Sequence, residues 1–282
     1  MSADRAVELI RTAPKIGALP AAYLELSRLL DDPDSSNENI GRAVIKDPAL
    51  TAQLLRIVNS AYFGLNRPVD RISKAVALVG REQLRHVALA TSVIHMFRLL
   101  PESMISMDSF WKHSLATGLC ARGLGQNVPV RGEVLFTAGL LHDVGSLVIC
   151  LNRPRAARNI LMECENSGRL IDEVEREVLG CDHAEVGAAL LTDWGIRGPA
   201  VAATAYHHKV SMAEEHRRAV AVVHVADVVV AALQLGSSGE HLVPCFDPAA
   251  WRYAGLDVAA LQSVVTVLEA EFDVITSAML AA

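Results

Sequence analysis

Histidine and aspartate residues interrupt apolar stretches of the chain at several positions. His142 and Asp143 end one such run, His113 lies in a second, and Asp227 lies in a third, between valines. A buried imidazole or carboxylate must be hydrogen-bonded or bound to a metal, because its transfer from water is costly. Mixed nitrogen and carboxylate ligands suit Zn, Fe, Mn, Ni or Co, so these residues predict a divalent metal site in a helical core. Gly145 is expected to let the chain turn sharply beside this pair.

Further histidines follow the same pattern. His183 begins an otherwise apolar helix, and His207-His208 ends an apolar run. A structural interpretation stays open for each position: a backbone carbonyl can satisfy His113, and His183 can be a helix-start residue beside a capping Asp182. His224 lies one turn before Asp227 and is expected to pack in the core or to support a ligand. The remaining histidines, at 86, 95, 216 and 241, fit no pattern.

The composition is that of a globular helical protein. Of 282 residues, 51 % are hydrophobic and 21 % charged, and only 5 % are aromatic. The net charge of −6 removes the simplest electrostatic argument for nucleic-acid binding. The five cysteines are scattered and form no Cys-x-x-Cys pair, which indicates reduced thiols. The charged N-terminus is no signal peptide, and the apolar stretch 219–235 contains His224 and Asp227. We therefore expect a cytoplasmic protein without a membrane span.

Apolar residues recur at helical spacing almost throughout, which predicts an all-α fold. The segment 101–107 breaks this pattern and predicts a boundary between two helical subdomains, residues 1–103 and 104–282. Asp47-Pro48 predicts a helix start, and Asp182 with Glu185 predicts a capping box. The expected helices span about 20–30, 36–46, 48–60, 72–79, 81–97, 108–124, 131–143, 153–167, 170–180, 182–194, 199–209, 213–234 and 257–279, with a loop at 236–255.

The order of these polar residues resembles the metal-binding pattern of the HD phosphohydrolase superfamily. The surrounding sequence resembles its HDOD branch over roughly residues 15–230. The matching stretches are 47–64 (Asp-Pro-Ala-Leu through Tyr-Phe-Gly), 72–80, 111–114 (Trp-Lys-His-Ser), 138–143 (Ala-Gly-Leu-Leu-His-Asp) and 182–187. Together these stretches are specific, although no single one would be.

The resemblance implies an all-α fold whose C-terminal part is an HD-like core, in a bacterial signal-transduction protein. It implies metal ligation by four residues, namely His113, His142, Asp143 and Asp227. It also suggests that His183, His207 and His208 serve a second metal or contact phosphate. Many HDOD proteins have no established enzymatic activity, so the resemblance leaves open whether the chain is an enzyme.

Three departures from the related HD-GYP phosphodiesterases argue against hydrolysis of cyclic di-GMP. Ser146 stands where those enzymes carry Lys, Ser109 stands where some carry a metal-binding Glu, and no Gly-Tyr-Pro follows His208. Lys112 and Lys209 are the nearest candidates to replace the missing cation. We therefore favour a regulatory module that contacts a protein partner or a small nucleotide, with little or no cyclic di-GMP hydrolysis. The alternative is a metal-dependent phosphohydrolase acting on a nucleotide or phosphodiester.

The loop around residues 62–71 is a candidate partner-binding surface. Tyr62 and Phe63 lie close in sequence to Arg67 and Arg71, and aromatic residues beside arginine are common in binding surfaces. The alternative is that the two aromatic residues only cap the core. The helix pair 72–97, split by Gly80, superficially resembles a helix-turn-helix, but Gly80 is as well explained as a helix C-cap, and the sequence disfavours DNA as a partner.

Overall fold

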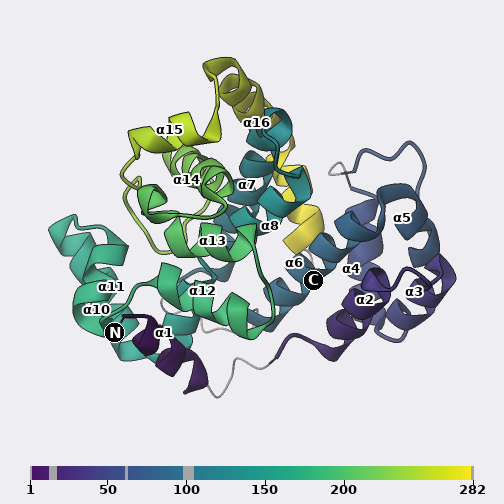
Figure 1. The fold of residues 1–282 in the computed structure, drawn as a ribbon, viewed down its shortest axis with the longest axis horizontal. Coiled ribbons are helices and arrows are strands. Elements are labelled where there is room, and N and C mark those ends of the chain that lie inside the picture. The colour runs from purple at the N-terminus through teal and green to yellow at the C-terminus, as the bar shows by residue number, and fades with distance from the viewer. Residues whose placement is uncertain (1, 13–17, 61–62, 98–104, 281–282) are drawn as a thin grey trace. The chain divides into compact units, whose positions relative to one another are not determined.

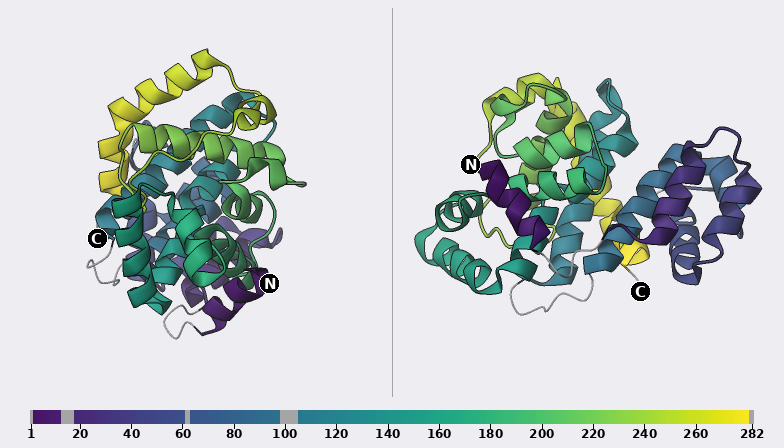
Figure 2. Two further views of the ribbon diagram at one scale, coloured as in Figure 1. Left: turned by 90° about the vertical axis from the view of Figure 1, so that its left-hand side faces the viewer. Right: turned by 60° about the horizontal axis from the view of Figure 1, so that its bottom comes forward.

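The computed structural model describes residues 2–12, 18–60, 63–97 and 105–280. Every regular element in these ranges is helical: sixteen α-helices and two short 3-10 turns follow one another without a strand (Figures 1 and 2). The all-α prediction is confirmed. The predicted starts are confirmed as well, since Asp47 Oδ1 accepts the Leu50 N–H at 3.0 Å and Asp182 forms the expected capping box with Glu185.

The chain divides into two compact units that are each discontinuous in sequence. The larger comprises residues 1–17 and 99–268, and the smaller comprises residues 18–98 and 269–282. The boundary segment predicted at 101–107 falls partly on residues 98–104, which lie outside the described residues.

The smaller unit is built on five helices with a shared apolar core. They are α2 (Ala21–Asp31), α3 (Asn37–Val44), α4 (Pro48–Val58), α5 (Ile72–Val79) and α6 (Arg81–Phe97). Helix α5 packs on α3, and both α2 and α4 pack on α6. Gly80 ends α5 with φ +90°, a conformation that favours glycine, so its interpretation as a C-cap is confirmed.

The candidate partner loop lies between α4 and α5. Asn59 closes its base, because the side chain donates to the Val69 carbonyl at 2.8 Å and accepts the Val69 N–H at 2.7 Å. Arg67 and Arg71 are exposed and Phe63 is half-buried. Tyr62 lies outside the described residues.

The larger unit contains the predicted metal residues. Its helices are α1 (Ser2–Arg11), α7 (Met107–Leu124), α8 (Gly132–Leu141), α9 (Val144–Asn152), α10 (Pro154–Ser167), α11 (Ile171–Leu179), α12 (His183–Asp193), α13 (Pro199–Tyr206), α14 (Arg217–Ala232), α15 (Pro248–Ala254) and the first part of α16 (Val258–Leu280). Helix α7 packs against α8 and α14, while α13 contacts α8, α12 and α14. The helices that carry the polar residues are therefore neighbours in the core, with His113 and Asp227 inside α7 and α14 and the other residues at or next to helix ends.

Three helices are absent from the sequence-based assignment: α1, α9 and α15. The prediction of a continuous loop over 236–255 is wrong for 248–254, where Asp247 Oδ1 accepts the Ala249 N–H at 2.8 Å and caps α15. Asp247-Pro248 is the same start signal as Asp47-Pro48, but the helix that follows is only seven residues long and too short to show periodicity.

One stretch, Gly132–Asn152, is long and apolar enough to cross a membrane by length and composition alone. Its hydropathy window is 89 % buried against other parts of the chain, and the stretch includes His142 and Asp143. Burial of this kind is expected of a core helix pair packed inside a helical protein.

Candidate metal centre

The first group of site residues gathers around the Asp143 and Asp227 carboxylates. His113 projects from α7, with Nε2 lying 3.1 Å from Asp227 Oδ1 and 3.7 Å from Asp143 Oδ2. His142, at the end of α8, places Nε2 3.1 Å from Asp143 Oδ2 and 3.5 Å from Asp227 Oδ1. All four side chains are at least nine-tenths buried. Two imidazole nitrogens therefore face two carboxylate oxygens in a space of metal-site dimensions.

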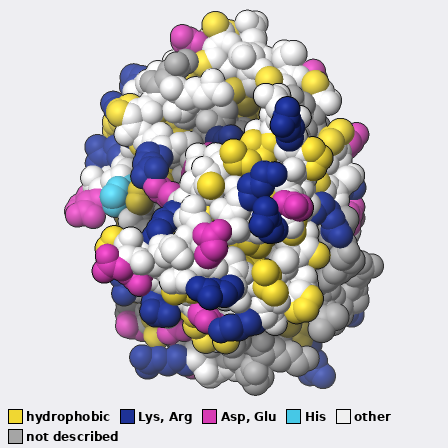
Figure 3. Space-filling model, turned by 90° about the vertical axis from the view of Figure 1, so that its right-hand side faces the viewer, with side chains coloured by type: hydrophobic (Ala, Val, Ile, Leu, Met, Phe, Trp, Pro, Cys, Tyr) yellow, Lys and Arg dark blue, Asp and Glu magenta, His cyan; other side chains and the backbone are white. Residues whose placement is uncertain are grey.

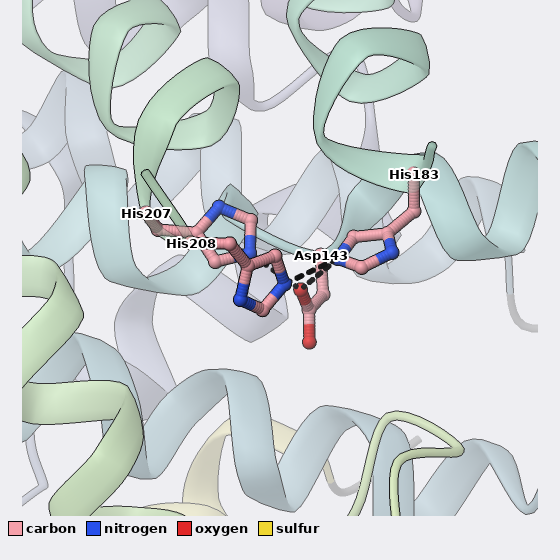
Figure 4. Close-up of side chains that lie close together, drawn as sticks. All are labelled: Asp143, His183, His207 and His208. Carbon is pink, nitrogen blue, oxygen red and sulfur yellow. Dashed lines mark hydrogen bonds and ion pairs between the residues drawn. The ribbon is translucent and has the colours of Figure 1, made fainter. Parts of the chain in front are cut away.

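A second group meets the other oxygen of Asp143. His183 Nε2 and His207 Nε2 each lie 3.4 Å from Asp143 Oδ1, and His208 Nε2 lies 2.9 Å from His183 Nε2 (Figure 4). In each of two sets, one potential ligand atom per residue lies within 4.8 Å of the others; the sets are Asp143 with His183, His207 and His208, and Asp143 with His113 and His142. The structure thus brings all seven predicted site residues together, with Asp143 common to both sets.

Close helix crossings at glycines make this convergence possible. Gly139 of α8 packs on α7, where a Cβ would lie 2.8 Å from Gly118 Cα and from the Thr117 carbonyl oxygen. Gly145 of α9 packs on α12, where a Cβ would overlap the His183 carbonyl oxygen and lie 2.6 Å from Gly187 N. The chain does turn at His142 and Asp143, between α8 and α9, but Gly145 is the second residue of α9 and is not in the left-handed region, so the turn itself does not require glycine there. Its missing side chain instead allows two backbones to touch, which brings His183 to Asp143.

Hydrogen-bond acceptors at Nδ1 orient the rings of His142, His183 and His207, so that Nε2 of each ring faces the Asp143 carboxylate. His142 Nδ1 lies 2.6 Å from the Gly139 carbonyl oxygen, and His207 Nδ1 lies 3.0 Å from the Thr204 carbonyl oxygen. His183 Nδ1 lies 2.6 Å from Glu175 Oε2. An acceptor at Nδ1 keeps the proton there and leaves Nε2 with a lone pair, as in histidines that bind metals. Sequence reasoning missed Glu175, because it lies on α11 with three further acidic residues, Asp172, Glu173 and Glu177, and no local pattern sets it apart from them.

His224 supports the cluster indirectly, through the backbone of His207. Its Nδ1 lies 2.7 Å from the His207 carbonyl oxygen, and its Nε2 accepts the Asp247 N–H at 2.9 Å. Burial lowers the pKa of His224, which favours the neutral ring that this arrangement needs. The supporting role expected of His224 therefore matches its contacts, which tie the backbone of His207 to the start of α15.

In the cluster, the buried carboxylates and imidazoles shift each other's pKa values in the direction that favours their charged forms. Burial by itself lowers the pKa of His142, but Asp143 and Asp227 outweigh burial and hold that pKa well above its usual range. Burial likewise opposes charge on the two carboxylates, yet the surrounding imidazoles hold the pKa of each well below its usual range. For His183, Glu175 and Asp143 outweigh burial and raise the pKa to about 10. In the metal-free cluster, protons on imidazoles thus balance the buried carboxylates.

The donor set fits a divalent metal. Among the described residues, the buried Nε2 atoms of His142 and His207 have no partner in hydrogen-bond geometry, although each faces the carboxylate of Asp143. Such atoms are costly in a protein interior unless something binds them. Imidazole nitrogens with carboxylate oxygens suit Zn, Fe, Mn, Ni or Co. These residues could therefore hold one ion at each side of Asp143.

A pocket of about 280 Å³ opens onto the cluster. A segment after α14 forms part of its wall: Ser237 N–H donates to Ser109 Oγ at 3.0 Å, and Glu240 Oε2 accepts the Ile171 N–H at 2.8 Å. Ser109, which stands where some HD-GYP enzymes carry a metal-binding Glu, therefore anchors this segment. His241, which fitted no sequence pattern, also lines the pocket.

The described part of the pocket lining lacks the long cationic side chains that usually bind phosphate. None of the described residues that line it is Lys or Arg. Lys112 Nζ lies 2.7 Å from Asp108 and Lys209 Nζ lies 3.7 Å from Asp182, so neither of the expected replacements lines the pocket. Ser146 is buried and lines a separate small cavity beside Glu175. The site therefore combines metal ligands with walls that carry no cation to bind phosphate.

Comparison with known proteins shows which protein family the sequence matches. A model of the HDOD domain matches residues 16–210. A Treponema pallidum (strain Nichols) protein, described as "Uncharacterized protein", is 29 % identical over 227 residues, which are 76 % of this chain but 42 % of that protein, so the chain spans less than half of its length.

Solved structures share the fold. An HDOD domain protein of unknown function from Geobacter sulfurreducens superposes with a TM-score of 0.81 at 23 % identity, covering 99 % of this chain and 97 % of that one. A protein from Shewanella amazonensis SB2B, described as "Putative phosphohydrolase", gives a TM-score of 0.78 at 23 % identity over 96 % and 97 % of the two chains.

Proposed function

Because the chain belongs to the HDOD family and carries a converged His/Asp cluster, we propose that it is a signal-transduction module that binds divalent metal and a small phosphate-bearing ligand. One observation carries this proposal: six imidazole and carboxylate side chains gather around Asp143, and a pocket opens directly onto the cluster. Metal and ligand occupancy would then be the state that the module reports to a protein partner.

In this proposal, His113, His142, Asp143 and Asp227 hold one ion. His183, His207 and His208 hold a second ion with the other oxygen of Asp143, or contact phosphate. A bound ion supplies a positive centre that attracts phosphoryl oxygens. The protein supplies the orientation of each ring, through the acceptors behind His142, His183 and His207.

The pocket walls support a regulatory role over hydrolysis of cyclic di-GMP. Phosphoryl transfer depends on positive groups placed around the developing charge, and Ser146 leaves the usual lysine position without one. The described lining residues offer no substitute cation. We therefore expect cyclic di-GMP turnover well below about 1 per second, a rate ordinary for enzymes.

A second candidate function is metal-dependent hydrolysis of another phosphate ester. The observation that favours it is the position of Asp143, whose two oxygens face separate histidine groups. If these two groups each held an ion, the ions would supply the chemistry of two-metal hydrolases, in which metal activates water and stabilises the leaving oxygen. The Shewanella amazonensis structure described as "Putative phosphohydrolase" has the same fold and is consistent with this alternative.

The proposed partner surface is the loop closed by Asn59. Its exposed Arg67 and Arg71 and its half-buried Phe63 combine charge with apolar area. Figure 3 views the molecule from the side of α3 and α5, where cationic, acidic and apolar side chains are interspersed. A mixed surface favours a protein partner over DNA, which selects a continuous basic field.

Metal analysis tests the proposal. Protein purified without chelator is expected to contain about two equivalents of a transition metal, and Asp143→Ala is expected to contain almost none, because Asp143 contributes to both positions. Asp193→Ala, which removes an exposed carboxylate at the end of α12, is the matched control and should bind as the unmodified chain does. A metal-free unmodified protein, or equal metal in all three proteins, would overturn the proposal.

A further inference from the structure

Helix α10 carries its exposed charges against the helix dipole. Four other helices, α1, α3, α7 and α11, have an acidic residue in the first turn and a basic residue in the last turn, which is the order that the partial charges at helix ends favour. In α10 the order is reversed, because Arg155 lies in the first turn and Glu165 in the last. Among the described residues, neither side chain has an ion-pair partner that would offset this cost.

These two residues belong to one exposed stripe on α10. The members of the α10 stripe are Arg155, Arg158, Met162 and Glu165. Their spacing is that of the a and d positions of a heptad, so the four side chains share one face of the helix. The other face is buried through Ile160 and Cys164. Met162, in the middle of the stripe, is 54 % exposed, so the stripe combines an apolar centre with a cationic and an anionic end.

A hollow of about 340 Å³ lies beside the α10 stripe. It is lined by Arg158, Met162 and Glu165 of the stripe and by Ser106 and Ser109 at the start of α7. Figure 1 shows α10 and α11 at the outer edge of the larger unit. A hollow along one side of an exposed helix can accept the side chains of a second helix packed against it.

We propose that the α10 stripe is a self-complementary interface through which two copies of this chain associate, with their α10 helices antiparallel. In an antiparallel pair centred on residue 160, residues equally far before and after 160 face each other. Arg155 then faces Glu165 of the second copy, and Arg158 faces Met162 of the second copy. The two-fold axis repeats both contacts. Each charge that opposes the helix dipole therefore meets an opposite charge, and the aliphatic part of Arg158 covers the exposed methionine.

The mixed charge of the stripe favours a second copy over a nucleic acid, which selects a continuous basic surface. It also limits the strength of the contact, because exposed ion pairs contribute more to specificity than to affinity. The 14 residues of α10 form a helix about 21 Å long, so the interface is smaller than that of a stable dimer. We therefore expect a weak dimer with a Kd of about 1–100 µM.

Analytical ultracentrifugation of the full chain at about 1–500 µM tests the inference. The unmodified protein is expected to show a monomer–dimer equilibrium in this range. Arg155→Glu combined with Arg158→Glu makes every charge of the stripe negative, and Glu165→Arg makes every charge positive. Each variant alone is therefore expected to dimerise at least about tenfold more weakly. An equimolar mixture of the two variants places opposite charges at both ends of the helix pair, so it should form a heterodimer with a Kd within about threefold of that of the unmodified dimer.

Glu163→Arg is the matched control, because it makes the same charge change at an exposed position of α10 that lies outside the stripe. It should leave the Kd of the dimer unchanged. Circular dichroism should show the same helix content in all variants, since every substituted side chain is exposed. An unmodified protein that stays monomeric throughout this range, variants that dimerise as well as the unmodified chain, or a mixture that stays monomeric would overturn the inference.

Discussion

A single carboxylate oxygen, Glu175 Oε2, accepts two hydrogen bonds from His183. The backbone N–H of His183 lies 2.7 Å away and its ring Nδ1 lies 2.6 Å away. The first contact fixes the start of α12, and the second fixes the tautomer and the plane of the ring. Both residues are about 2 % exposed, so water does not compete for these bonds. Glu175 is therefore a positioning residue for the second histidine group.

We expect Glu175→Gln to weaken metal binding about 10- to 100-fold, because a neutral amide holds Nδ1–H less firmly and lowers the basicity of Nε2. Competition titration with a chromogenic chelator measures this affinity. The control is Glu177→Gln on the same helix, whose carboxylate pairs with Arg169 at the surface, and it should change nothing. If both variants bind metal equally, Glu175 has no positioning role.

Gly145→Ala tests the helix crossing that brings His183 to Asp143. The added Cβ overlaps the His183 carbonyl oxygen, and backbone cannot move aside as a flexible side chain can. We expect a loss of about 1–3 kcal/mol of stability, or more, together with weaker metal binding. Denaturant unfolding and metal titration measure the two effects.

Gly132→Ala is the matched substitution in a helix. There the new Cβ would meet Arg122 Cγ at 3.2 Å, which a long side chain can relieve by shifting, and the Arg122 carbonyl oxygen at 3.8 Å, an ordinary contact distance. Stability should change by no more than about 0.5 kcal/mol, helped by the higher helix propensity of alanine. Equal losses in the two variants would argue against a special role for the crossing at Gly145.

Sequence alone supplied the all-α class, most helix starts and all seven residues of the cluster. These features could be predicted because a helix cap is marked by residues close together in sequence, and because a polar residue within an apolar run is conspicuous. The convergence of the cluster was not accessible from periodicity, since it depends on which helices cross. It came from the order of motifs resembling a known family.

The missed features share a physical cause. Glu175 and His241 matter through burial or pocket position, which tertiary contacts decide, and neither lies in a distinctive local pattern. Gly145 was interpreted as a turn because glycine permits both turns and close packing, and only the position of α12 distinguishes them. Helix α15 was missed because seven residues are too few to show periodicity.

Metal affinity should rise with pH. In the metal-free protein, the pKa of His183 is raised to about 10 from 6.5 and that of His142 is raised well above its usual value, so protons occupy the rings at neutral pH and metal must displace them. Titrations in buffers of different ionisation enthalpy are expected to report proton release at pH 7 and a falling apparent Kd between pH 6 and 9. Proton uptake, or a Kd independent of pH, would contradict this.

The raised pKa of His183 also determines how the stability of the metal-free protein changes with pH. A folded-state pKa above the unfolded value means that protonated His183 stabilises the fold. This contribution is fully present below about pH 6.5 and is lost as the pH rises through about 10. Chelator-treated protein should therefore lose stability across that range, and Glu175→Gln should reduce the loss, because Glu175 is the largest favourable influence on the His183 proton.

The Asn59-closed loop gives the last prediction. Arg67 and Arg71 are exposed, and the ion pair of Arg71 with Asp70, at 3.7 Å, is too exposed to contribute much stability. Arg67→Glu combined with Arg71→Glu should therefore change stability by less than about 0.5 kcal/mol per substitution. If the loop binds a protein partner, the same double variant should abolish capture of that partner in a pull-down, because two charge reversals turn attraction into repulsion. Arg28→Glu on α2, an exposed arginine elsewhere in the smaller unit, should preserve capture. A large loss of stability, or capture that survives the double reversal, would mean that the loop serves the fold and does not bind a partner.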